Sequence, residues 1–457
     1  MNAPGTPNNP LRIAIIGSGP SGFYAAEALL QSDYTVEVDV LERLPVPYGL
    51  VRHGVAPDHP RLKDVADTYA LIAKHPRFSF VGNISFGRDF TVDELGDCYH
   101  AAIFATGAAT DRRLGIPGET LPGIHAASSF VGWYNGHPDF RDQQFDFSTE
   151  CAVIVGQGNV AIDICRILAK SIDELRKTDI AAHALEALAE SRIREIYLIG
   201  RRGPAQARFT TKELRELGQL SECDPIVDPT DLILSEQSKA ELNDPREPIR
   251  ARNFEVFRSF SARRREKAKA CQFRFFLSPR EARGAVGLEE LVLERNQLVG
   301  PAGHQQAVGT GDTVSIKAGL MIRSVGYRGV PLEGIPFDDA CGTIPNVNGR
   351  VSLRSSQELP MYVAGWIKRG PSGIIGTNRA CSIATVTTLL GELSSFSSQP
   401  KPGYAALKCS LDQRSLKQVS FGGWEAIDRA ERQRGLLSEK PREKFTRIAE
   451  MLAASDT

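Results

Sequence analysis

Leu11-Arg-Ile-Ala-Ile-Ile-Gly-Ser-Gly-Pro-Ser-Gly22 is the stretch of sequence that decides the fold. Its apolar first half, Leu11–Ile16, predicts a buried strand, and its second half is a complete Gly-x-Gly-x-x-Gly fingerprint. Glycines in this pattern allow a tight turn and let a pyrophosphate approach the N-terminus of the following helix. Helical sequence continues to about Gln31, and an alternating run from Thr35 to Leu41 returns as a strand. The chain therefore begins with a β-α-β dinucleotide-binding unit.

Glu42, at the end of the returning strand, indicates which nucleotide this first unit accepts. A carboxylate at this place accepts hydrogen bonds from ribose hydroxyls and disfavours a 2′-phosphate. We therefore expect Gly17, Gly19, Gly22 and Glu42 to contact a dinucleotide. Ordinary turn glycines with a solvated glutamate are the alternative, and the site by itself could hold NAD or FAD.

A second fingerprint, Gly156-Gln-Gly-Asn-Val-Ala161, repeats the arrangement. It follows an apolar strand at 152–155 and opens an apolar-periodic helix from about Val160 to Lys170. Alanine is allowed at the third small position, because that residue serves the packing of helix against strand. The chain returns in a predicted strand, Glu195–Ile199, and so forms a second dinucleotide-binding unit.

Gly200-Arg201-Arg202 stands where this second unit would otherwise carry its ribose carboxylate. Arginines there can hold a 2′-phosphate by bidentate, charge-assisted hydrogen bonds. We therefore predict NADPH rather than NADH at the second site and FAD at the first, an arrangement suited to hydride transfer between nicotinamide and flavin. A solvated pair of arginines at a strand end is the alternative.

The composition agrees with a protein of two α/β nucleotide-binding domains. The 457 residues exceed the roughly 250–300 at which one hydrophobic core stops growing. Another predicted strand at 101–105 ends in Thr106-Gly107, so we place the first domain boundary near 108. The 55 basic and 55 acidic residues cancel, which leaves no general attraction for nucleic acid or for an anionic membrane.

Patterns that are missing from the sequence indicate the cellular location of the protein and the role of its cysteines. No apolar run is long enough to span a bilayer, and Met1–Pro10 has no signal-peptide pattern, so a cytoplasmic enzyme is expected. The eight cysteines are scattered without a C-x-x-C pair, which argues against a dithiol, a zinc site or an iron–sulfur cluster. No metal site is expected.

A third glycine-dense segment, Gly365–Asn378, precedes a helical run from Arg379 to Leu390. A helix N-terminus aimed at a flavin would stabilise the negative charge that develops on its reduced ring. Trp366 offers a plane for the ring system, although a tryptophan is more often a core or surface residue.

Together these motifs resemble the adrenodoxin reductase-like family of NADPH–ferredoxin reductases. The resemblance covers about 11 to 450 and is carried by Gly17-Ser-Gly-Pro-Ser-Gly22, Pro47-Tyr-Gly-Leu-Val-Arg52, Gly54-Val-Ala-Pro-Asp-His-Pro60, Gly156-Gln-Gly-Asn-Val160, Gly200-Arg-Arg-Gly-Pro204, Glu213-Leu-Arg-Glu-Leu217 and Trp366-Ile-Lys-Arg-Gly-Pro371. It implies a glutathione reductase-like fold in which an NADP domain, 109–330, is inserted in an FAD domain, 1–108 and 331–457. It also implies that hydride from NADPH reduces FAD, which passes single electrons to a separate small iron–sulfur protein.

The resemblance further implies individual contacts. FAD contacts are implied at Ser21, Glu42, Leu50, Ile84, Trp366, Gly373, Ile374 and Ile375. NADP contacts are implied at Gln157, Gly158, Asn159, Val160, Arg201, Arg202, Glu213 and Gly373. His59 and Glu216 match polar positions expected near the nicotinamide and flavin, and with Trp366 they are the candidate catalytic residues. Because hydride transfer needs no side-chain base, a loop histidine and an exposed helix glutamate remain alternatives for the first two.

A basic run in this neutral chain suggests where an acidic ferredoxin would dock. The run contains Arg250, Arg252, Arg258, Arg263, Arg264, Arg265, Lys267 and Lys269 against only two glutamates. Phe254, Phe257 and Phe260 recur at helical spacing, so one face could pack inward while the basic face meets the partner. A basic face that is merely solvated is the alternative.

Two other functions remain open at this point. A two-electron flavin reductase acting on a dithiol would need a C-x-x-C relay, which the sequence lacks. A regulatory module that binds FAD and NADP without turnover needs no further motif.

Overall fold

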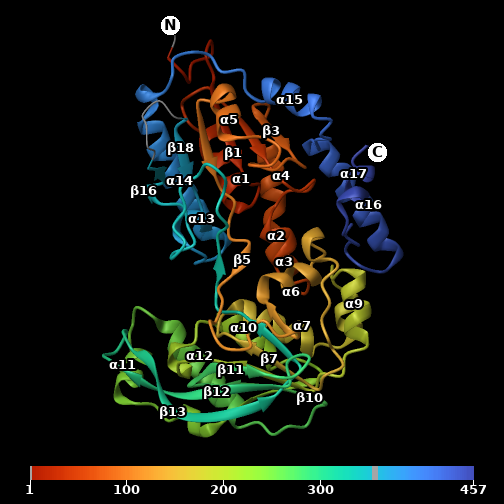
Figure 1. Cartoon of the computed structure of the whole chain (residues 1–457), viewed down its shortest axis with the longest axis vertical. Coiled ribbons are helices and arrows are strands. Elements are labelled where there is room, and N and C mark those ends of the chain that lie inside the picture. The colour runs from red at the N-terminus through yellow and green to blue at the C-terminus, as the bar shows by residue number, and fades with distance from the viewer. Residues whose placement is uncertain (1–2, 353–358, 457) are drawn as a thin grey trace. The chain divides into compact units, whose positions relative to one another are not determined.

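The computed structural model describes residues 3–352 and 359–456. The chain divides into two compact units: unit 1 comprises residues 1–110, 135–138 and 327–457, and unit 2 comprises 111–134 and 139–326. Unit 2 is thus inserted in the chain of unit 1, and both contain sheets and helices (Figure 1). The sequence predicts that the NADP domain begins after residue 108 and that the FAD domain resumes at residue 331. Residues 1–2, 353–358 and 457 of the predicted FAD domain lie outside the described residues.

Unit 1 is built on a seven-stranded sheet of order β16-β17-β18-β4-β1-β2-β3, in which β18, β4, β1, β2 and β3 are parallel. Its strands are β1 (Leu11–Ile16), β2 (Val36–Leu41), β3 (Phe78–Val81), β4 (Ala101–Phe104), β16 (Asn346–Val347), β17 (Arg350–Val351) and β18 (Met361–Val363). β1 is buried on both faces: Leu11, Ile13 and Ile15 belong to one hydrophobic cluster, and Ala14 and Ile16 belong to another. This central strand therefore ends inside the unit, where the first glycine turn begins.

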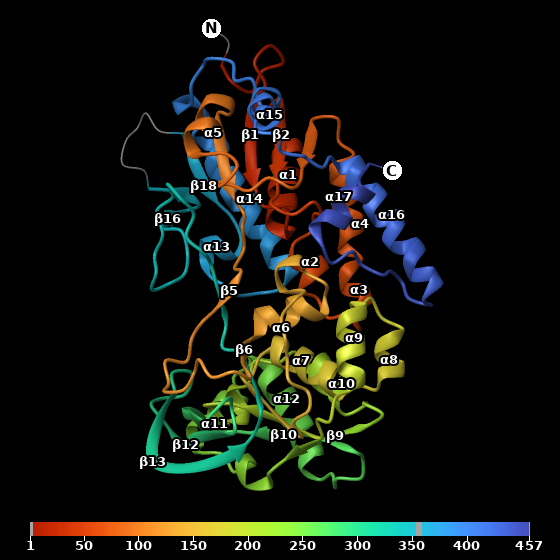
Figure 2. The same cartoon turned by 45° about the vertical axis from the view of Figure 1, so that its right-hand side comes forward.

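Helices cover both faces of this sheet, and α1 packs along α14 (Figure 2). The helices of unit 1 are α1 (Pro20–Leu30), α2 (Leu50–His53), α3 (Pro60–Lys63), α4 (Val65–Ala73), α5 (Val92–Cys98), α13 (Trp366–Arg369), α14 (Ile375–Gly391), α15 (Tyr404–Gln413), α16 (Phe421–Leu437), α17 (Ile448–Ala454) and a 3-10 turn at Leu393–Ser395.

Unit 2 contains a six-stranded parallel sheet of order β6-β14-β7-β8-β10-β9 and a three-stranded antiparallel sheet, β11-β12-β13. Its strands are β6 (Ile124–Ala126), β7 (Cys151–Val155), β8 (Glu195–Ile199), β9 (Cys223–Val227), β10 (Lys269–Arg274), β11 (Leu277–Arg283), β12 (Glu290–Val299), β13 (Gln306–Lys317) and β14 (Leu320–Arg323). Val153, Leu293 and Met321 share one cluster, so the smaller sheet packs on one face of the larger. The predicted α/β fold with two Rossmann-like sheets is confirmed.

The helices of unit 2 include α7, which follows the second glycine turn and packs on β7, β8 and β10. They are α6 (Ala127–Tyr134), α7 (Asn159–Ala169), α8 (Ile172–Arg176), α9 (Ala182–Ala189), α10 (Thr211–Leu217), α11 (Glu236–Leu242), α12 (Pro248–Ser261) and 3-10 turns at Pro138–Phe140, Pro204–Gln206 and Pro229–Leu232. Two short strands, β5 (Thr110–Asp111) and β15 (Tyr327–Arg328), lie where the chain passes between units.

Pro225, Pro229 and the charged stretch that runs on to Pro248 predict an exposed loop, but the structure differs from this prediction. Pro225 lies within β9, which is an edge strand and can therefore accommodate a residue without an N–H group. Further along, the side chain of Ser235 accepts a hydrogen bond from Ser238 N and starts α11. The prediction of a loop was wrong because an edge position and a helix cap both outweigh the local proline signal.

Helix length decides whether any element could cross a bilayer. Within residues 3–352 and 359–456, none of the helices is long and apolar enough to do so.

Candidate nucleotide-binding sites

The first glycine turn joins β1 to α1 and is closed on one side and open on the other. Gly17 has φ +106°, and a Cβ there would lie 2.7 Å from Ala105 O. At Gly22 a Cβ would lie 2.1 Å from Gly17 O, so this position requires glycine. At Gly19, the N-cap of α1, a Cβ would meet no atom of the described chain within 4 Å, apart from its own neighbours. The open side exposes a backbone concavity at a helix N-terminus, which suits a pyrophosphate.

Glu42 is held at the edge of this turn by three donors. Ser18 donates to Glu42 Oε2 from its backbone N at 3.0 Å and from its Oγ at 2.7 Å. Leu44 N donates to Oε1 at 3.1 Å. A carboxylate offers about four lone-pair sites. The fixed side chain therefore keeps capacity for a ribose hydroxyl.

Two other predicted FAD contacts lie beside the turn in different ways. Tyr48 N donates to Ser18 O at 3.0 Å, and a Cβ on the next residue, Gly49, would lie 3.1 Å from Gly19 Cα. Leu50 follows Gly49 and has 37% of its surface exposed. Ile84 donates its backbone N to Glu42 O at 3.0 Å, but only 1% of its surface is exposed. Ile84 is therefore buried beside Glu42, and its contact with FAD stays a prediction.

The third glycine-dense segment meets the first turn within unit 1. A Cβ at Gly365 would lie 2.0 Å from Ser21 Oγ, and Ser382 Oγ of α14 donates to Ser21 O at 2.9 Å. Gly373 has φ +83° and precedes Ile374, the exposed N-cap of α14, and Ile375, its first residue. The structure thus brings residues from the two ends of unit 1 together around Ser21.

Two of the candidate catalytic residues lie in unit 1. Trp366 begins α13 and donates its indole N–H to Ser372 O at 3.2 Å, while part of its ring stays exposed. His59 is the N-cap of α3, is half-buried, and donates its backbone N to Ala56 O at 3.0 Å.

A buried ion pair, which the sequence does not reveal, anchors α2 and with it Leu50, the first residue of that helix. Arg52 donates from Nη1 to Glu431 Oε2 at 2.9 Å and from Nη2 to Oε1, and these residues are 5% and 0% exposed. Glu431 also accepts from Phe445 N at 2.9 Å. Burial, together with neighbouring positive groups such as Arg52, holds the pKa of the adjacent His53 well below its usual value.

The second glycine turn joins β7 to α7 and repeats this geometry in unit 2. Gly156 has φ +147°, and a Cβ there would lie 2.2 Å from Ser324 O. Gly158, the N-cap of α7, is as open as Gly19. Gln157 Nε2 is buried without a hydrogen-bond partner in the described chain, and Asn159 Oδ1 accepts from Thr210 N at 2.9 Å. An unsatisfied donor beside an open turn fits a bound nucleotide.

Arg201 and Arg202 follow β8 without an ion pair or hydrogen bond to their guanidinium groups from the described residues. Arg201 is exposed and Arg202 is half-buried. The backbone that carries them is fixed: Asn296 Nδ2 donates to Arg201 O at 2.9 Å, and Phe276 N donates to Arg202 O at 3.2 Å. Burial, followed by nearby arginines, lowers the pKa of Arg202. Two cations on a fixed backbone, with no hydrogen bond or ion pair from the described residues, indicate an anion site.

The remaining predicted residues of unit 2 lie on or next to α10 and at the start of α7. Glu213 accepts a hydrogen bond from Thr210 Oγ1 at 2.8 Å, and Val160 occupies the first turn of α7. Glu216 lies 3.8 Å from Nη1 of the buried Arg166 of α7. That ion pair gives Glu216 a structural contact, and its part in turnover stays a prediction.

Comparison with known proteins places these sites in a family. The sequence-family model of the pyridine nucleotide-disulphide oxidoreductases matches residues 11–214 of this chain. NADPH-ferredoxin reductase FprA of Mycobacterium tuberculosis is 44% identical over 457 residues, which cover 97% of this chain and 98% of the relative. The mitochondrial NADPH:adrenodoxin oxidoreductase of Arabidopsis thaliana is 42% identical over 469 residues, covering 98% and 96%. The chain belongs to the adrenodoxin reductase-like family of NADPH–ferredoxin reductases.

The fold of this reductase-family chain agrees with that of a solved relative. A structure of Mycobacterium tuberculosis FprA in complex with NADPH superposes with a TM-score of 0.92 at 44% identity, and covers 98% of this chain and 100% of the other. The resemblance to this family, which the sequence motifs predict, is therefore confirmed over nearly the whole length of the chain.

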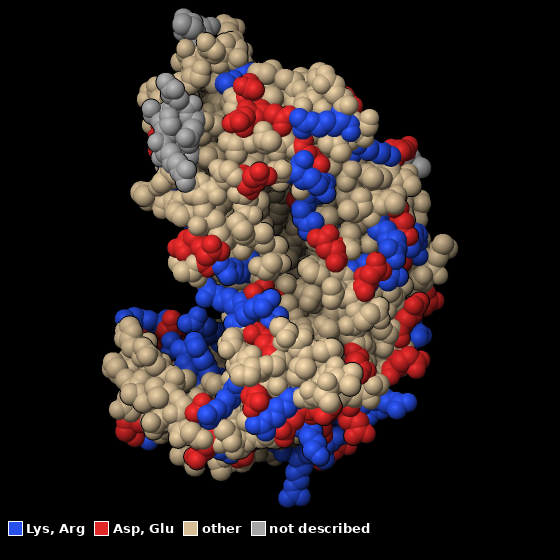
Figure 3. Space-filling view, viewed as in Figure 1, with Lys and Arg blue, Asp and Glu red and all other residues tan. Residues whose placement is uncertain are grey.

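The basic run predicted to dock a partner of the reductase is divided by the structure. α12 ends at Ser261, and Lys269 already belongs to β10. Phe257 and Phe260 are buried as predicted, whereas Phe254 is only partly so. Figure 3 shows basic side chains gathered on unit 2 near α11 and α12, with acidic ones among them.

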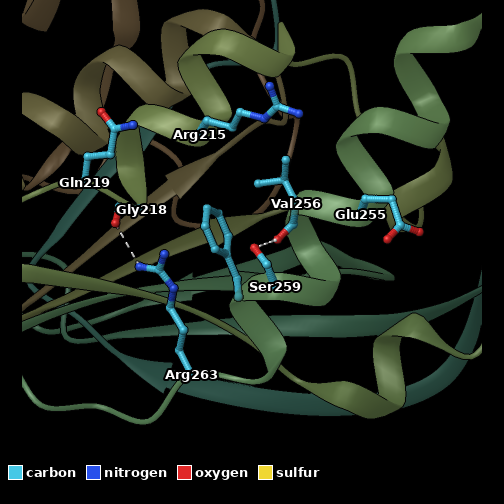
Figure 4. A pocket seen from close by; sticks show the side chains of 8 residues that line it. Arg215, Gly218, Gln219, Glu255, Val256, Ser259 and Arg263 are labelled. Atoms are coloured by element: carbon cyan, nitrogen blue, oxygen red, sulfur yellow. Dashed lines mark hydrogen bonds between the residues drawn. The ribbon is translucent and has the colours of Figure 1, made fainter.

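Several charges of this run are already engaged. Arg250 pairs with Glu241 at 2.5 Å, Lys269 Nζ donates to Leu168 O at 3.1 Å, and Lys267 Nζ to Leu220 O. Arg263 donates to Gly218 O at 2.9 Å across the ring of Phe260, in a pocket of about 360 Å³ between α10 and α12 (Figure 4). Arg265 pairs with Glu195 and Arg258 with Glu255. Among the described residues, Arg252 and Arg264 remain as exposed members without such a partner.

Proposed function

We propose that this chain is an NADPH:ferredoxin oxidoreductase, which takes hydride from NADPH onto FAD and delivers single electrons to a ferredoxin-type iron–sulfur protein. The observation that carries the proposal is the opposite charge at the ribose ends of two otherwise matching glycine turns, Glu42 in unit 1 and Arg201 with Arg202 in unit 2. Relatives at more than 40% identity over nearly the full length are named for this activity, with ferredoxin or adrenodoxin as the acceptor.

FAD is proposed to occupy unit 1. The open turn at Gly19 and the N-terminus of α1 would hold its pyrophosphate, and Glu42 would accept hydrogen bonds from its ribose. Leu50, Trp366 and the Gly373–Ile375 start of α14 would line the ring. Ile84, buried beside Glu42, would contact FAD from within unit 1. FAD, once bound, supplies a ring system that accepts a hydride and releases its electrons one at a time.

NADPH is proposed to occupy unit 2. Gly158 and the start of α7 would hold the pyrophosphate, and Gln157 Nε2 is a buried donor without another partner in the described chain. Arg201 and Arg202 would bind the 2′-phosphate, while Glu213 would accept from a hydroxyl. His59 and Trp366 would orient the reacting rings. Glu216, held by Arg166, would act on the bound NADPH through the position of α10.

Substituting Gly19 tests the FAD site. Gly19→Ala should keep its fold, because Gly19 has φ −74° and its Cβ would meet no other described atom within 4 Å. The added methyl group would instead occupy the space proposed for the pyrophosphate, so the purified variant should contain less than about a tenth of the wild-type flavin. The flavin-to-protein absorbance ratio measures this.

Gly391→Ala is the matched control for this experiment. Gly391 is the exposed last residue of α14 and also has open space at its Cβ, so this variant should keep its flavin. Full flavin content in Gly19→Ala would contradict the placement of the pyrophosphate.

The two alternative functions account for less of the structure. A dithiol reductase would need an accessible thiol pair. The structure does bring Cys165 and Cys271 to a sulfur–sulfur distance of 3.1 Å, but both are 0% exposed and burial raises the pKa of Cys271. Buried thiols that resist ionisation are poor nucleophiles. A regulatory module without turnover needs no acceptor, so ferredoxin reduction distinguishes it directly.

An acidic ferredoxin is proposed to dock on the exposed part of the basic run, centred on Arg252 and Arg264. Ferredoxin reduction should then slow several-fold as ionic strength rises, because exposed charges are screened over about 8 Å at physiological salt. The double variant Arg252→Glu with Arg264→Glu should reproduce this slowing at low salt, measured as kcat/KM for ferredoxin.

Ferricyanide is the control acceptor for this prediction, since it needs no docking surface. Its reduction should keep the same rate in the double variant. Equal salt dependence for both acceptors would show that the basic run is only solvated.

The proposed function itself is tested by steady-state assay of the purified protein with NADPH and each ferredoxin of the same cell. Reduction of one ferredoxin with NADPH, and poor activity with NADH, is the expected result. A protein that binds both cofactors and reduces no ferredoxin would be the regulatory module instead. The cytoplasmic location expected from the sequence stays a prediction.

A further inference from the structure

The chain that leaves the Arg201-Arg202 pair turns back along the second glycine turn. After the 3-10 turn at Pro204–Gln206, Arg208 N donates to Gln157 O at 3.1 Å. Two residues later, Thr210 N donates to Asn159 Oδ1 at 2.9 Å. Arg208 is therefore fixed by its own backbone to the turn that carries Gln157 and Gly158, although it belongs to neither nucleotide motif.

The residues on both sides of Arg208 anchor it firmly. Ala207 is 5% exposed and Phe209 is 1% exposed. Asn253 Nδ2 donates to Phe209 O at 2.7 Å, and the Phe209 ring packs edge-on against Phe257. Arg208 itself is exposed, and its guanidinium has no ion pair or hydrogen bond within the described part of the chain. A fixed Cα that carries an unengaged cation is preorganised for an external ligand.

Arg208 also acts on the charge of the neighbouring pair. After burial, Arg208 is the largest cause of the lowered pKa of Arg202, ahead of Arg201. Glu241 opposes this effect, but its carboxylate already accepts from Gln206 Nε2 at 3.0 Å and from Gly303 N at 2.9 Å, in addition to Arg250. Arg201 and Arg208 thus both repel Arg202, and the three arginines lack an unengaged acidic partner among the described residues.

We propose that Arg208 is a third arginine for the 2′-phosphate of NADPH and contributes to the selectivity for NADPH over NADH. A phosphate monoester carries about −1.5 to −2 charges and three acceptor oxygens, enough for more than two guanidinium groups. This proposal rests on the proposed function, since it assigns a further residue to the same NADPH site. The segment that carries Arg208 does not follow β8 directly, and it reaches the site because it folds back on Gln157.

The test is binding of adenosine 2′,5′-bisphosphate and of ADP to the purified flavoprotein by calorimetry. The first probe carries the 2′-phosphate and the second does not. Arg208→Ala should weaken binding of the bisphosphate about tenfold, the effect of losing one charge-assisted hydrogen bond, and should leave ADP binding unchanged. Arg208→Lys, which keeps the charge and loses the planar fork, should fall between wild type and alanine.

Arg192→Ala is the matched control. Arg192 is also an exposed arginine of unit 2, but it precedes β8, whereas Arg201 follows that strand. The substitution Arg192→Ala therefore removes the same charge at the opposite end of β8. This variant should bind both probes like wild type. An unchanged bisphosphate affinity in Arg208→Ala, or equal weakening of both probes, would overturn the proposal.

The same experiment separates this proposal from the function on which it rests. If the wild type binds the bisphosphate tightly and is reduced by NADPH while Arg208→Ala changes neither affinity, only the role of Arg208 fails. If the wild type binds the bisphosphate no better than ADP, the NADPH site itself is wrong, and the proposal about Arg208 falls with it.

Discussion

Replacing Arg201 and Arg202 together with alanine should lower the selectivity for NADPH over NADH by about 3 kcal/mol, or roughly two orders of magnitude. Each arginine can make a charge-assisted hydrogen bond to the 2′-phosphate worth at least about 1.5 kcal/mol, and NADH has no group to receive it. The backbone of both residues is held by Asn296 and Phe276, so the substitution removes charge and keeps the turn. The measurement is kcat/KM with each cofactor.

The double lysine variant is the matched control for this prediction. Lysines keep both charges but lose the planar fork, so the variant should retain part of the selectivity. An unchanged ratio of the two kcat/KM values in the double alanine variant would show that Arg201 and Arg202 are only a solvated pair, and the second site would lose its assignment to NADPH.

Glu431→Ala should destabilise the protein by about 3–5 kcal/mol, because it leaves Arg52 charged and unpaired inside unit 1. Arg52 is 5% exposed and Glu431 is 0% exposed, so water cannot replace the lost carboxylate. Since Arg52 follows Leu50 in α2, the flavin should also dissociate more readily. Urea denaturation followed by circular dichroism measures the first effect, and flavin release measures the second.

Glu425→Ala provides the comparison on the same helix. Glu425 lies on the exposed side of α16, so the same substitution there should change stability by less than about 0.5 kcal/mol. Equal effects of the two substitutions would mean that the Arg52–Glu431 pair does not hold α2 in place.

The parts of the fold that follow local patterns could be predicted from the sequence. β1 and β8 begin and end at the predicted residues, because short apolar runs bounded by glycine turns leave little choice of register. The helices after both glycine turns were predictable for the same reason. β9 was missed, because the cost of Pro225 in a strand depends on whether the strand lies at the edge of its sheet, which no local pattern shows.

The contacts that complete the sites connect residues far apart in the sequence. Arg52 and Glu431 are 379 residues apart, and Ser382, which donates to Ser21 O, is 361 residues from it. Arg208 is close to Arg202 in sequence, but its link to Gln157 depends on a turn that brings it back to the nucleotide loop. Motif spacing pointed to the two arginines after β8 because they follow a strand end directly, and it could not point to Arg208.

The basic run at 250–269 shows that a partner-binding surface, too, cannot be predicted from the sequence pattern alone. Counting charges along 250–269 treats every side chain as available, whereas the structure engages Arg250, Arg265 and Lys269 with groups of unit 2 itself. A docking surface depends on the charges that remain exposed, and those can be identified only once the fold is known.

Anaerobic mixing of the purified protein with NADPH, followed by oxidised ferredoxin, tests the central claim most directly. The account predicts that NADPH rapidly bleaches the flavin absorbance while NADH does so far more slowly, and that each NADPH then reduces a pair of ferredoxin molecules, one electron to each. A flavin that stays oxidised in NADPH, or a reduced flavin that passes no electrons to any ferredoxin, would contradict it.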